Sequence, residues 1–462
     1  MSKVIYSMLF DAVLAVAALL AAIAVRFGNA DIGGKLSDSV TLVTMVIFVV
    51  AVIFSSHLME VYDESKNLKK REVVVNVLFG AATSFSLISV AYYLGADAML
   101  GRGILFIALC IFVPLQLISQ TLQLIGKRQS RFSRRVLVLG TGDLALQIGE
   151  MISSRIHNFT LVGYAFCDTD SGEKTVDTVS PIVPQDRIMG SCDDLLGMAQ
   201  LNRVDLIVMA LSERRGVFPL RDVLRCKLNG IQIMDAPSLY ELAQGKLMLE
   251  SITPSWFIFS DGFRRNTIMN TCKRAIDVAL SGIGLLMTLP FFPLIALAIK
   301  LDSPGPVLFR QERVGNHERL FVLYKFRTMG QDAEKASGAV WAEKNDPRVT
   351  RLGKFFRGSR IDEIPQLINV LKGDMSFIGP RPERLEFVEK LKLVIPFYSK
   401  RHFIKPGLTG WAQVRYPYGA SVEDAFEKLR YDLYYIKNMG PNLDTLIFFE
   451  TIKVVLFGYG GR

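Results

Sequence analysis

The sequence predicts a membrane protein that combines an α-helical bundle, an α/β domain and a carboxyl-terminal region that opens with another apolar segment. The 462-residue chain is 50% hydrophobic, with a mean hydropathy of +0.30, which is more apolar than an ordinary soluble enzyme. The excess is concentrated in four long apolar runs near the amino terminus. Between residues 135 and 250, buried-strand patterns then alternate with helical patterns, as in parallel α/β folds.

The four apolar runs, at about residues 5–25, 39–58, 73–94 and 103–125, each approach the length needed to cross a bilayer. The first run is not expected to be a cleaved signal peptide, because Asp11 interrupts it and three more runs follow. A carboxylate in an apolar helix suggests a function by default. Because Asp11 lies near the end of its run, it could instead reach the membrane interface.

Basic residues orient this bundle. They gather in the loop between the second and third runs and after the fourth run, at Lys66, Lys69, Lys70, Arg71, Lys127, Arg128, Arg131, Arg134 and Arg135. By the positive-inside rule, both ends of the bundle face the cytoplasm. The net charge of +10 suits a chain beside anionic lipid and anionic substrates. Nucleic acid is not an expected partner, because the arginines are scattered and form no basic recognition helix.

The middle region predicts a parallel, doubly wound sheet, with strands at residues 135–139, 161–166, 205–210 and 231–234. Gly140 and Gly142 follow the first strand, where such a turn can receive a pyrophosphate, with Asp168 touching a ribose. A single fingerprint of this kind equally marks a tight strand–helix turn. Binding of NAD is not favoured, because the substrate half of a dehydrogenase is missing.

A fifth apolar segment covers about residues 271–300 and is long enough to span a bilayer. A span here would put everything beyond it outside the cytoplasm. Pro290 lacks a backbone N–H and clashes with the preceding turn, so it can break the helix and return both ends to one face. Lys273 and Arg274 would then meet lipid phosphates. The alternative is that Pro290 and Pro293 merely kink a spanning helix.

Residues 357–382 contain a carboxylate pair, Asp362 and Glu363, just before Pro365 and an apolar run. A purely structural interpretation is that Asp362 caps a helix, with Glu363 in the first turn. Cations crowd the pair on both sides, at Arg348, Arg351, Lys354, Arg357, Arg360, Arg381 and Arg384. A carboxylate among arginines and a helix N-terminus is held deprotonated, as a nucleophile must be. The residues alone leave a phosphate-handling site and a structural cap equally open.

This stretch resembles the signature of the bacterial sugar transferases, the polyisoprenyl-phosphate hexose-1-phosphate or monotopic phosphoglycosyl transferases. The resemblance covers about residues 270–462 and includes QERVG at 311–315, KFRTM at 325–329, DPRVTR at 346–351 and PGLTGW at 406–411. The whole chain resembles the long members, which initiate exopolysaccharide or O-antigen synthesis. The expected domains are a four-helix transmembrane bundle at 1–128, a Rossmann-like α/β domain at 129–262, and a mainly α catalytic domain at 263–462 that a re-entrant membrane helix anchors.

The resemblance implies transfer of a sugar 1-phosphate from a UDP-sugar to polyprenyl (undecaprenyl) phosphate at the bacterial inner membrane, with release of UMP. Asp362 would attack the β-phosphorus, form a phosphosugar–aspartyl intermediate and bind Mg²⁺, while Glu363 would assist proton handling. The remaining expected phosphate- or substrate-binding residues are Arg313, Lys325, Arg357, Arg381 and Asp444. One departure concerns the helix break, where some members have Ser and this chain has Leu289, so a Ser cap of the backbone is not expected.

Several alternatives stay open. Lys325 and Arg327 could lie on a solvated strand face, and Asp444 could be only a helix cap. Tyr434 and Tyr435 suit either the membrane interface or core packing. The whole chain could also be a membrane-tethered NAD-dependent nucleotide-sugar enzyme, or a non-enzymatic scaffold for polysaccharide assembly. The bundle and the sheet could support a homodimer.

Overall fold

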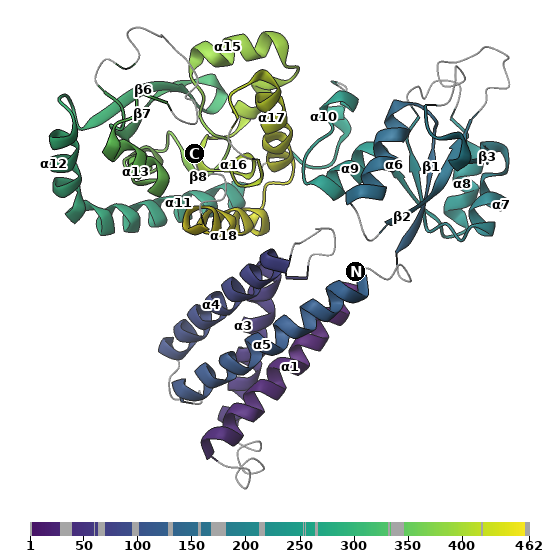
Figure 1. The fold of residues 1–462 in the computed structure, drawn as a ribbon, viewed down its shortest axis with the longest axis horizontal. Helices are drawn as coiled ribbons and strands as arrows, with labels where there is room; N and C mark the ends of the chain where they lie inside the picture. Colours follow the sequence, from purple (N-terminus) through teal and green to yellow (C-terminus); the bar gives the residue numbers. More distant parts are fainter. Residues whose placement is uncertain are drawn as a thin grey trace. The chain divides into compact units, whose positions relative to one another are not determined.

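The structure is a computed structural model. It describes residues 2–27, 39–59, 61–62, 70–94, 101–127, 133–155, 159–167, 182–211, 218–252, 254, 256–263, 267–330, 333, 346–416 and 419–457. The chain divides into two compact units, Met1–Gln244 and Gly245–Arg462 (Figure 1). The second unit begins earlier than the expected residue 263, because the Trp411 indole N–H donates to Gly245 O at 2.7 Å.

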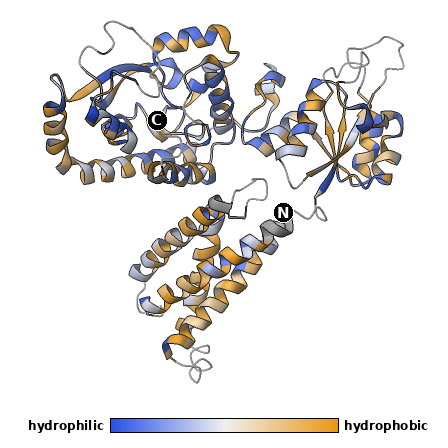
Figure 2. Cartoon of the chain, viewed as in Figure 1, coloured by the Kyte–Doolittle hydropathy of each residue, from blue (hydrophilic) through white to orange (hydrophobic). Residues whose placement is uncertain are grey.

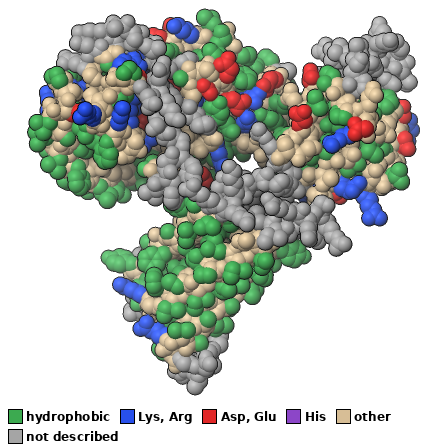
Figure 3. Space-filling view, in the orientation of Figure 1, with side chains coloured by type: hydrophobic (Ala, Val, Ile, Leu, Met, Phe, Trp, Pro, Cys, Tyr) green, Lys and Arg blue, Asp and Glu red, His purple; other side chains and the backbone are tan. Residues whose placement is uncertain are grey.

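Four long apolar helices open the first unit, and they confirm the four predicted runs: α1 (Ser2–Phe27), α3 (Ser39–Leu58), α4 (Lys70–Leu94) and α5 (Arg102–Lys127). Each is long and apolar enough to cross a membrane. Small and aliphatic residues such as Ala18, Leu19 and Ala108 fill their shared core. Figures 2 and 3 show that the outer surface of these helices is also largely hydrophobic.

Asp11 is fully buried inside this bundle. Its carboxylate accepts hydrogen bonds from Gln116 Nε2 at 2.7 Å and from the Tyr62 hydroxyl at 2.9 Å. Gln116 Nε2 also donates to Ser56 Oγ at 2.9 Å, so the cluster links α1, α3 and α5. The Asp11 side chain therefore binds groups within the bundle, and one of them, Tyr62, lies just beyond the end of α3.

The α/β part contains the predicted parallel sheet, in the order β3-β2-β1-β4-β5. Its strands are β1 (Arg134–Leu139), β2 (Phe159–Phe166), β3 (Ile188–Ser191), β4 (Leu206–Met209) and β5 (Gln232–Asp235). The sequence prediction missed β3, because this short edge strand is only half-buried and carries no apolar run.

The helices of this part cover both faces of the sheet (Figure 1). They are α6 (Asp143–Arg155) and α9 (Ala236–Gln244) on one face, and α7 (Leu195–Leu201) and α8 (Leu220–Leu228) on the other. At the end of β1, a Cβ on Gly140 would lie 2.5 Å from Ala210 O, so this position requires glycine for packing alone. Asp168, the predicted ribose contact, lies outside the described residues.

The second unit is mainly helical, as predicted. Its helices are α10 (Trp256–Phe259), α11 (Thr267–Thr288), α12 (Phe292–Asp302), α13 (Arg351–Ser359), α14 (Gln366–Lys372), α15 (Leu385–Val394), α16 (Trp411–Arg415), α17 (Val422–Lys437) and α18 (Pro441–Phe457). Strands β6 (Leu308–Val314) and β7 (Leu320–Phe326) form an antiparallel hairpin, and β8 (Ser376–Ile378) pairs in parallel with β9 (Gly407–Thr409). Tyr434 stacks on Trp411 and Tyr435 is buried, which favours core packing for these tyrosines.

The fifth apolar segment is broken at the predicted position. A 3₁₀ turn, η8 (Leu289–Phe291), contains Pro290 and separates α11 from α12, and Figure 1 shows the two helices running in different directions. The Thr288 hydroxyl donates to Gly284 O at 2.7 Å just before the break. Thr288 therefore bonds a carbonyl of the last helical turn, although Leu289 replaces the Ser of some relatives.

Candidate active site

A cavity of about 1210 Å³ lies within the second unit, between the β6–β7 hairpin and the α15–α17 region. Its acidic lining residues are Asp362, Glu363, Glu383 and Asp432. Its basic lining residues are Arg310, Arg313, Lys325, Arg327, Arg348, Arg357, Arg360, Arg381, Arg384, Arg401 and Lys428. This excess of positive charge suits a substrate that carries several phosphate charges.

A sharp turn presents the carboxylate pair to this cavity. Helix α13 ends at Arg360, whose φ of 59° lies in the left-handed region that non-glycine residues seldom adopt. The following 3₁₀ turn, η10 (Ile361–Glu363), contains both carboxylates. Helix α14 starts only at Gln366, with Pro365 as its N-cap. The predicted capping role of Asp362 is therefore wrong, because its side chain makes no cap hydrogen bond.

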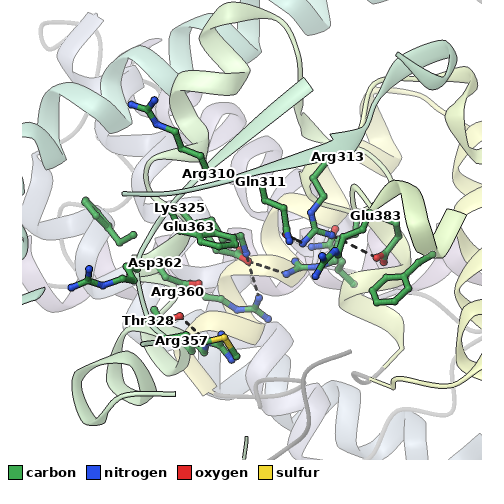
Figure 4. A pocket seen from close by; sticks show the side chains of 18 of the residues that line it. Arg310, Gln311, Arg313, Lys325, Thr328, Arg357, Arg360, Asp362, Glu363 and Glu383 are labelled. Atoms are coloured by element: carbon green, nitrogen blue, oxygen red, sulfur yellow. Dashed lines mark hydrogen bonds and ion pairs between the residues drawn. The ribbon is translucent and has the colours of Figure 1, made fainter. Parts of the chain in front are cut away.

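Asp362 is 7% exposed and lines the cavity. Within the described part of the chain, no side chain or backbone group forms a hydrogen bond or ion pair with its carboxylate, and Figure 4 draws no dashed line to it. Burial raises the pKa of Asp362, although Lys325 and Arg357 oppose this shift. Burial disfavours the ionised form, and only an ionised carboxylate can act as a nucleophile, so Lys325 and Arg357 help to keep Asp362 deprotonated.

Glu363 lies beside it in a different environment (Figure 4). Its Oε1 lies 3.1 Å from both Lys325 Nζ and Arg381 Nη2, and 3.7 Å from Arg360 Nη1. Burial would raise the pKa of Glu363, but these cations outweigh it and hold the pKa well below its usual range. The predicted stabilisation of an ionised carboxylate therefore applies to Glu363. Glu363 thereby holds Lys325 and Arg381 at the cavity, and its role in proton handling stays a prediction.

The predicted cations Arg313, Lys325, Arg357 and Arg381 meet in the same cavity, whereas Arg351 and Lys354 do not line it. The Lys325 side chain is 19% exposed, so the solvated-strand interpretation is wrong. Arg357 Nε donates to Thr328 Oγ1 at 3.0 Å, and Arg313 Nη1 donates to Pro382 O at 3.2 Å. These bonds bring side chains from β6, β7 and α13 around the turn that carries Asp362.

Arg327 has a role that the sequence analysis did not assign. It is 7% exposed, and its Nη2 donates to Ser303 O at 2.6 Å, just beyond the end of α12. The neighbouring Phe326 packs in a core with Ile299 of α12 and Phe356 of α13. The KFRTM motif therefore joins the apolar α11–α12 segment to the cavity.

Three predicted residues lie elsewhere. Asp444 accepts hydrogen bonds from Lys273 Nζ at 2.7 Å and from the Tyr435 hydroxyl at 2.6 Å, and it does not line the cavity. Arg274 donates to Val370 O at 2.6 Å and to Leu371 O at 2.7 Å, at the end of α14. Lys273 and Arg274 thus both bind groups within the unit, and their proposed contact with lipid phosphates stays a prediction.

Two buried charged residues in the cavity wall were missed. Arg401 and Asp432, 5% and 2% exposed, form an ion pair of 2.7 Å. Burial raises the pKa of Asp432 to about 6, against the pull of Arg401. A carboxylate among the apolar residues that surround it on α17, such as Leu429 and Leu433, was the available signal.

The expected Mg²⁺ ion can be compared with the residues present. Among the described residues, no group of three or more His, Cys, Asp or Glu side chains could hold a metal. Mg²⁺ is often bound by only one or two carboxylates together with substrate phosphates and water. The buried Asp362 carboxylate, which lines a cavity rich in arginine and lysine, fits this smaller donor set.

Comparisons with known proteins identify the family of this chain. A family model described as "Bacterial sugar transferase" matches residues 268–458. An Aeromonas hydrophila UDP-N-acetylgalactosamine-undecaprenyl-phosphate N-acetylgalactosaminephosphotransferase is 43% identical over 242 residues, 52% of this chain and 56% of the relative. A Komagataeibacter xylinus undecaprenyl-phosphate glucose phosphotransferase is 34% identical over 335 residues, 71% of this chain and 60% of the relative.

A third relative is matched almost completely. The exopolysaccharide production protein PSS of Rhizobium leguminosarum bv. phaseoli is 43% identical over 185 residues, which are 39% of this chain and 92% of that protein. The chain therefore belongs to the bacterial sugar transferase family, which confirms the predicted resemblance. It spans little more than half the length of the Aeromonas and Komagataeibacter relatives.

Proposed function

We propose that this protein transfers a sugar 1-phosphate from a UDP-sugar to undecaprenyl phosphate, as the first membrane step of exopolysaccharide or O-antigen synthesis. The observation that carries the proposal is Asp362, a buried carboxylate that faces a cavity rich in arginine and lysine. Two relatives are named as undecaprenyl-phosphate sugar phosphotransferases, one for N-acetylgalactosamine and one for glucose. Undecaprenyl phosphate is therefore proposed as the acceptor because both relatives are named for it, whereas their different sugars do not indicate which sugar this protein transfers.

The proposed reaction has two displacements at one phosphorus atom. A carboxylate oxygen of Asp362 bonds to the β-phosphorus while the bond from that phosphorus to the bridging oxygen breaks, and UMP leaves with this oxygen. An oxygen of the lipid phosphate then attacks the same phosphorus and restores the Asp362 carboxylate. Lys325 and Arg381, oriented by Glu363, stabilise the charge that develops on the phosphoryl oxygens.

Asp362 would also contribute an oxygen ligand to Mg²⁺. When bound, the ion would neutralise phosphate charge and withdraw electrons from phosphorus. The protein's own contribution is the cationic lining, which binds and orients the diphosphate whether or not the ion is present.

The apolar α11–α12 segment is proposed to enter the membrane and return to the cytoplasmic face, with both soluble parts of the chain in the cytoplasm. The break at Pro290 supports this topology. Large apolar side chains along both helices are exposed within the unit, including Leu286 (74%), Met287 (69%) and Leu294 (64%), and a bilayer would cover them. Nucleotide sugars are cytoplasmic substrates, so this placement keeps Asp362 beside both donor and acceptor.

Release of UMP from a panel of UDP-sugars, with and without undecaprenyl phosphate, tests this proposal. We expect one or a few donors to give UMP together with a radiolabelled lipid-linked sugar phosphate. A change in nicotinamide absorbance without lipid product would instead indicate an NAD-dependent nucleotide-sugar enzyme. No turnover with any donor would favour an assembly scaffold.

A further inference from the structure

The segment of residues 379–384 crosses the cavity wall and carries Arg381. Pro380 and Pro382 have no backbone N–H, so much of the segment can be held only through its carbonyl groups. Four consecutive carbonyls each accept a hydrogen bond: Pro380 O from Gly407 N (2.8 Å), Arg381 O from Arg401 Nη2 (3.1 Å), Pro382 O from Arg313 Nη1 (3.2 Å) and Glu383 O from Val314 N (2.9 Å). Hydrogen bonds from other elements therefore hold the backbone at each residue from Pro380 to Glu383.

The bond to Arg381 O comes from a buried side chain. Arg401 lies in the 3₁₀ turn η11 (Tyr398–Phe403), and its Nη1 donates to the Tyr398 hydroxyl at 2.6 Å. Its Nη2 lies 2.7 Å from Asp432 Oδ2 on α17. One planar guanidinium thus joins η11 and α17 to the backbone of the residue that carries the phosphate-binding side chain.

The chain of contacts continues to the carboxylate pair. Arg381 Nη2 lies 3.1 Å from Glu363 Oε1, and Glu363 adjoins Asp362 in η10. A shift of the Arg381 backbone would therefore move its guanidinium relative to Glu363. A displacement of about 1 Å in such a constellation can cost about 100-fold in rate.

We propose that Arg401, held by Asp432 and Tyr398, is a positioning residue that fixes the Arg381 backbone so that its guanidinium meets Glu363 and the donor diphosphate. This inference rests on the proposed function, since it concerns the same cavity. A buried ion pair is often neutral for stability compared with apolar side chains, because removing both charges from water is costly. Placement of Arg381 gives this pair a functional role.

The experiment is a double-mutant cycle on the full-length protein, with kcat/KM for transfer as the readout. Arg401→Lys keeps the positive charge beside Asp432 but removes the planar fork that reaches all three partners. Arg381→Lys removes the guanidinium whose placement is at issue. Arg430→Lys is the matched control, because Arg430 lies on α17, is ion-paired to Glu427 and does not line the cavity.

We expect Arg401→Lys to lower kcat/KM by at least about tenfold in the wild-type background, and by less than about threefold in the Arg381→Lys background. The control should change kcat/KM by less than about threefold in both. Equal losses in the two backgrounds would overturn the positioning role, since Arg401 would then act independently of Arg381. So would an unchanged kcat/KM in a folded Arg401→Lys variant.

Tyr398→Phe provides a second route if Arg401→Lys does not fold, because it removes one hydrogen bond and keeps the ion pair. Tyr398→Phe should lower kcat/KM by less than Arg401→Lys does, and this loss should disappear in the Arg381→Lys background. If the loss of kcat/KM persisted there, it would contradict the inference. Transfer by the wild-type protein distinguishes a failure of the proposed function from a failure of the positioning role. Absence of transfer in the wild type would refute the proposed function, whereas wild-type transfer with an additive cycle would refute only the positioning role.

Discussion

Asp362 and Glu363 are neighbours in the chain, yet their surroundings give them different chemistry. Glu363 binds three cations through one oxygen, whereas Asp362 has no such partner among the described residues. The left-handed Arg360 turn directs both side chains to one cavity. Under the proposed function, Asp362 reacts while Glu363 holds Lys325 and Arg381 in place.

This difference predicts that two isosteric variants both lose activity but differ in stability. Asp362→Asn should abolish UMP release and leave the melting temperature nearly unchanged, because no hydrogen bond or ion pair to a described residue is lost. Glu363→Gln should lower both activity and stability, the latter by about 1–3 kcal/mol, because Lys325 and Arg381 lose a charged partner. Transfer assays and thermal melts measure both effects. Near-normal UMP release by Asp362→Asn would rule out the aspartyl mechanism.

Asp432 predicts a specific pH dependence of stability. Its pKa is about 6 in the folded protein, because burial outweighs Arg401, against about 3.9 for an unfolded aspartate. The folded state therefore binds the extra proton, and this group adds stability as the pH falls through 6 towards 4. Glu383, Lys428 and Tyr398 also face it.

When the pH falls from 7 to 5, the free energy of unfolding of the wild type should rise relative to that of Asp432→Asn by about 1 kcal/mol. Thermal melts of both proteins at the two pH values give the comparison. A constant difference in stability would show that Asp432 does not titrate in this range.

At the scale of elements, the proposed topology rests on the break in the α11–η8–α12 segment. Replacing Pro290 and Pro293 with Ala restores two backbone donors and removes the ring clashes that a continuous helix would suffer. An interior proline destabilises a helix by about 3 kcal/mol, so the variant makes a continuous helix more favourable. A continuous helix over Thr267–Asp302 is 36 residues long and could cross the bilayer. We expect some molecules of this variant to place the second unit outside the cytoplasm.

Labelling of Asp302→Cys by an impermeant thiol reagent in intact cells measures this topology, in a background without the native cysteines. With both prolines present, the site should be protected, and in the double Ala variant it should become reactive. Lys35→Cys, in the predicted external loop, is the labelled control. Equal labelling at both positions with the prolines intact would show that the segment spans the membrane.

At the scale of the whole chain, the division at Gly245 predicts where the second unit can be cut. Leu247, Leu249 and Ile252 are buried in its core against α15 and α17. Lys246 pairs with Glu427 at 2.7 Å. A fragment that begins at Gly245 keeps these contacts, whereas one that begins at residue 265 loses them.

We expect the longer fragment to bind membranes and retain some transfer activity. The shorter fragment should melt at a lower temperature, because each buried aliphatic side chain contributes about 1.5–3 kcal/mol. Melting curves and UMP release of the two fragments provide the comparison. Complete inactivity of a well-folded longer fragment would mean that the first unit takes part in catalysis.

The sequence by itself determined the four apolar helices, the parallel sheet, the break at Pro290, and the carboxylate pair with its surrounding cations. These features depend on local composition and periodicity, which neighbouring residues carry. It also identified Arg313, Lys325, Arg357 and Arg381, which the fold brings into one cavity.

Only the tertiary structure decided how these groups are paired. Contacts between residues far apart in the chain determine which carboxylate receives the cations, because Lys325 and Arg381 reach Glu363 from other elements. The same reason explains why Asp444 binds Lys273 outside the cavity, and why Arg401 and Asp432 were missed. Ion pairs of this kind depend on how helices and strands pack, and a linear pattern of charges does not contain that geometry.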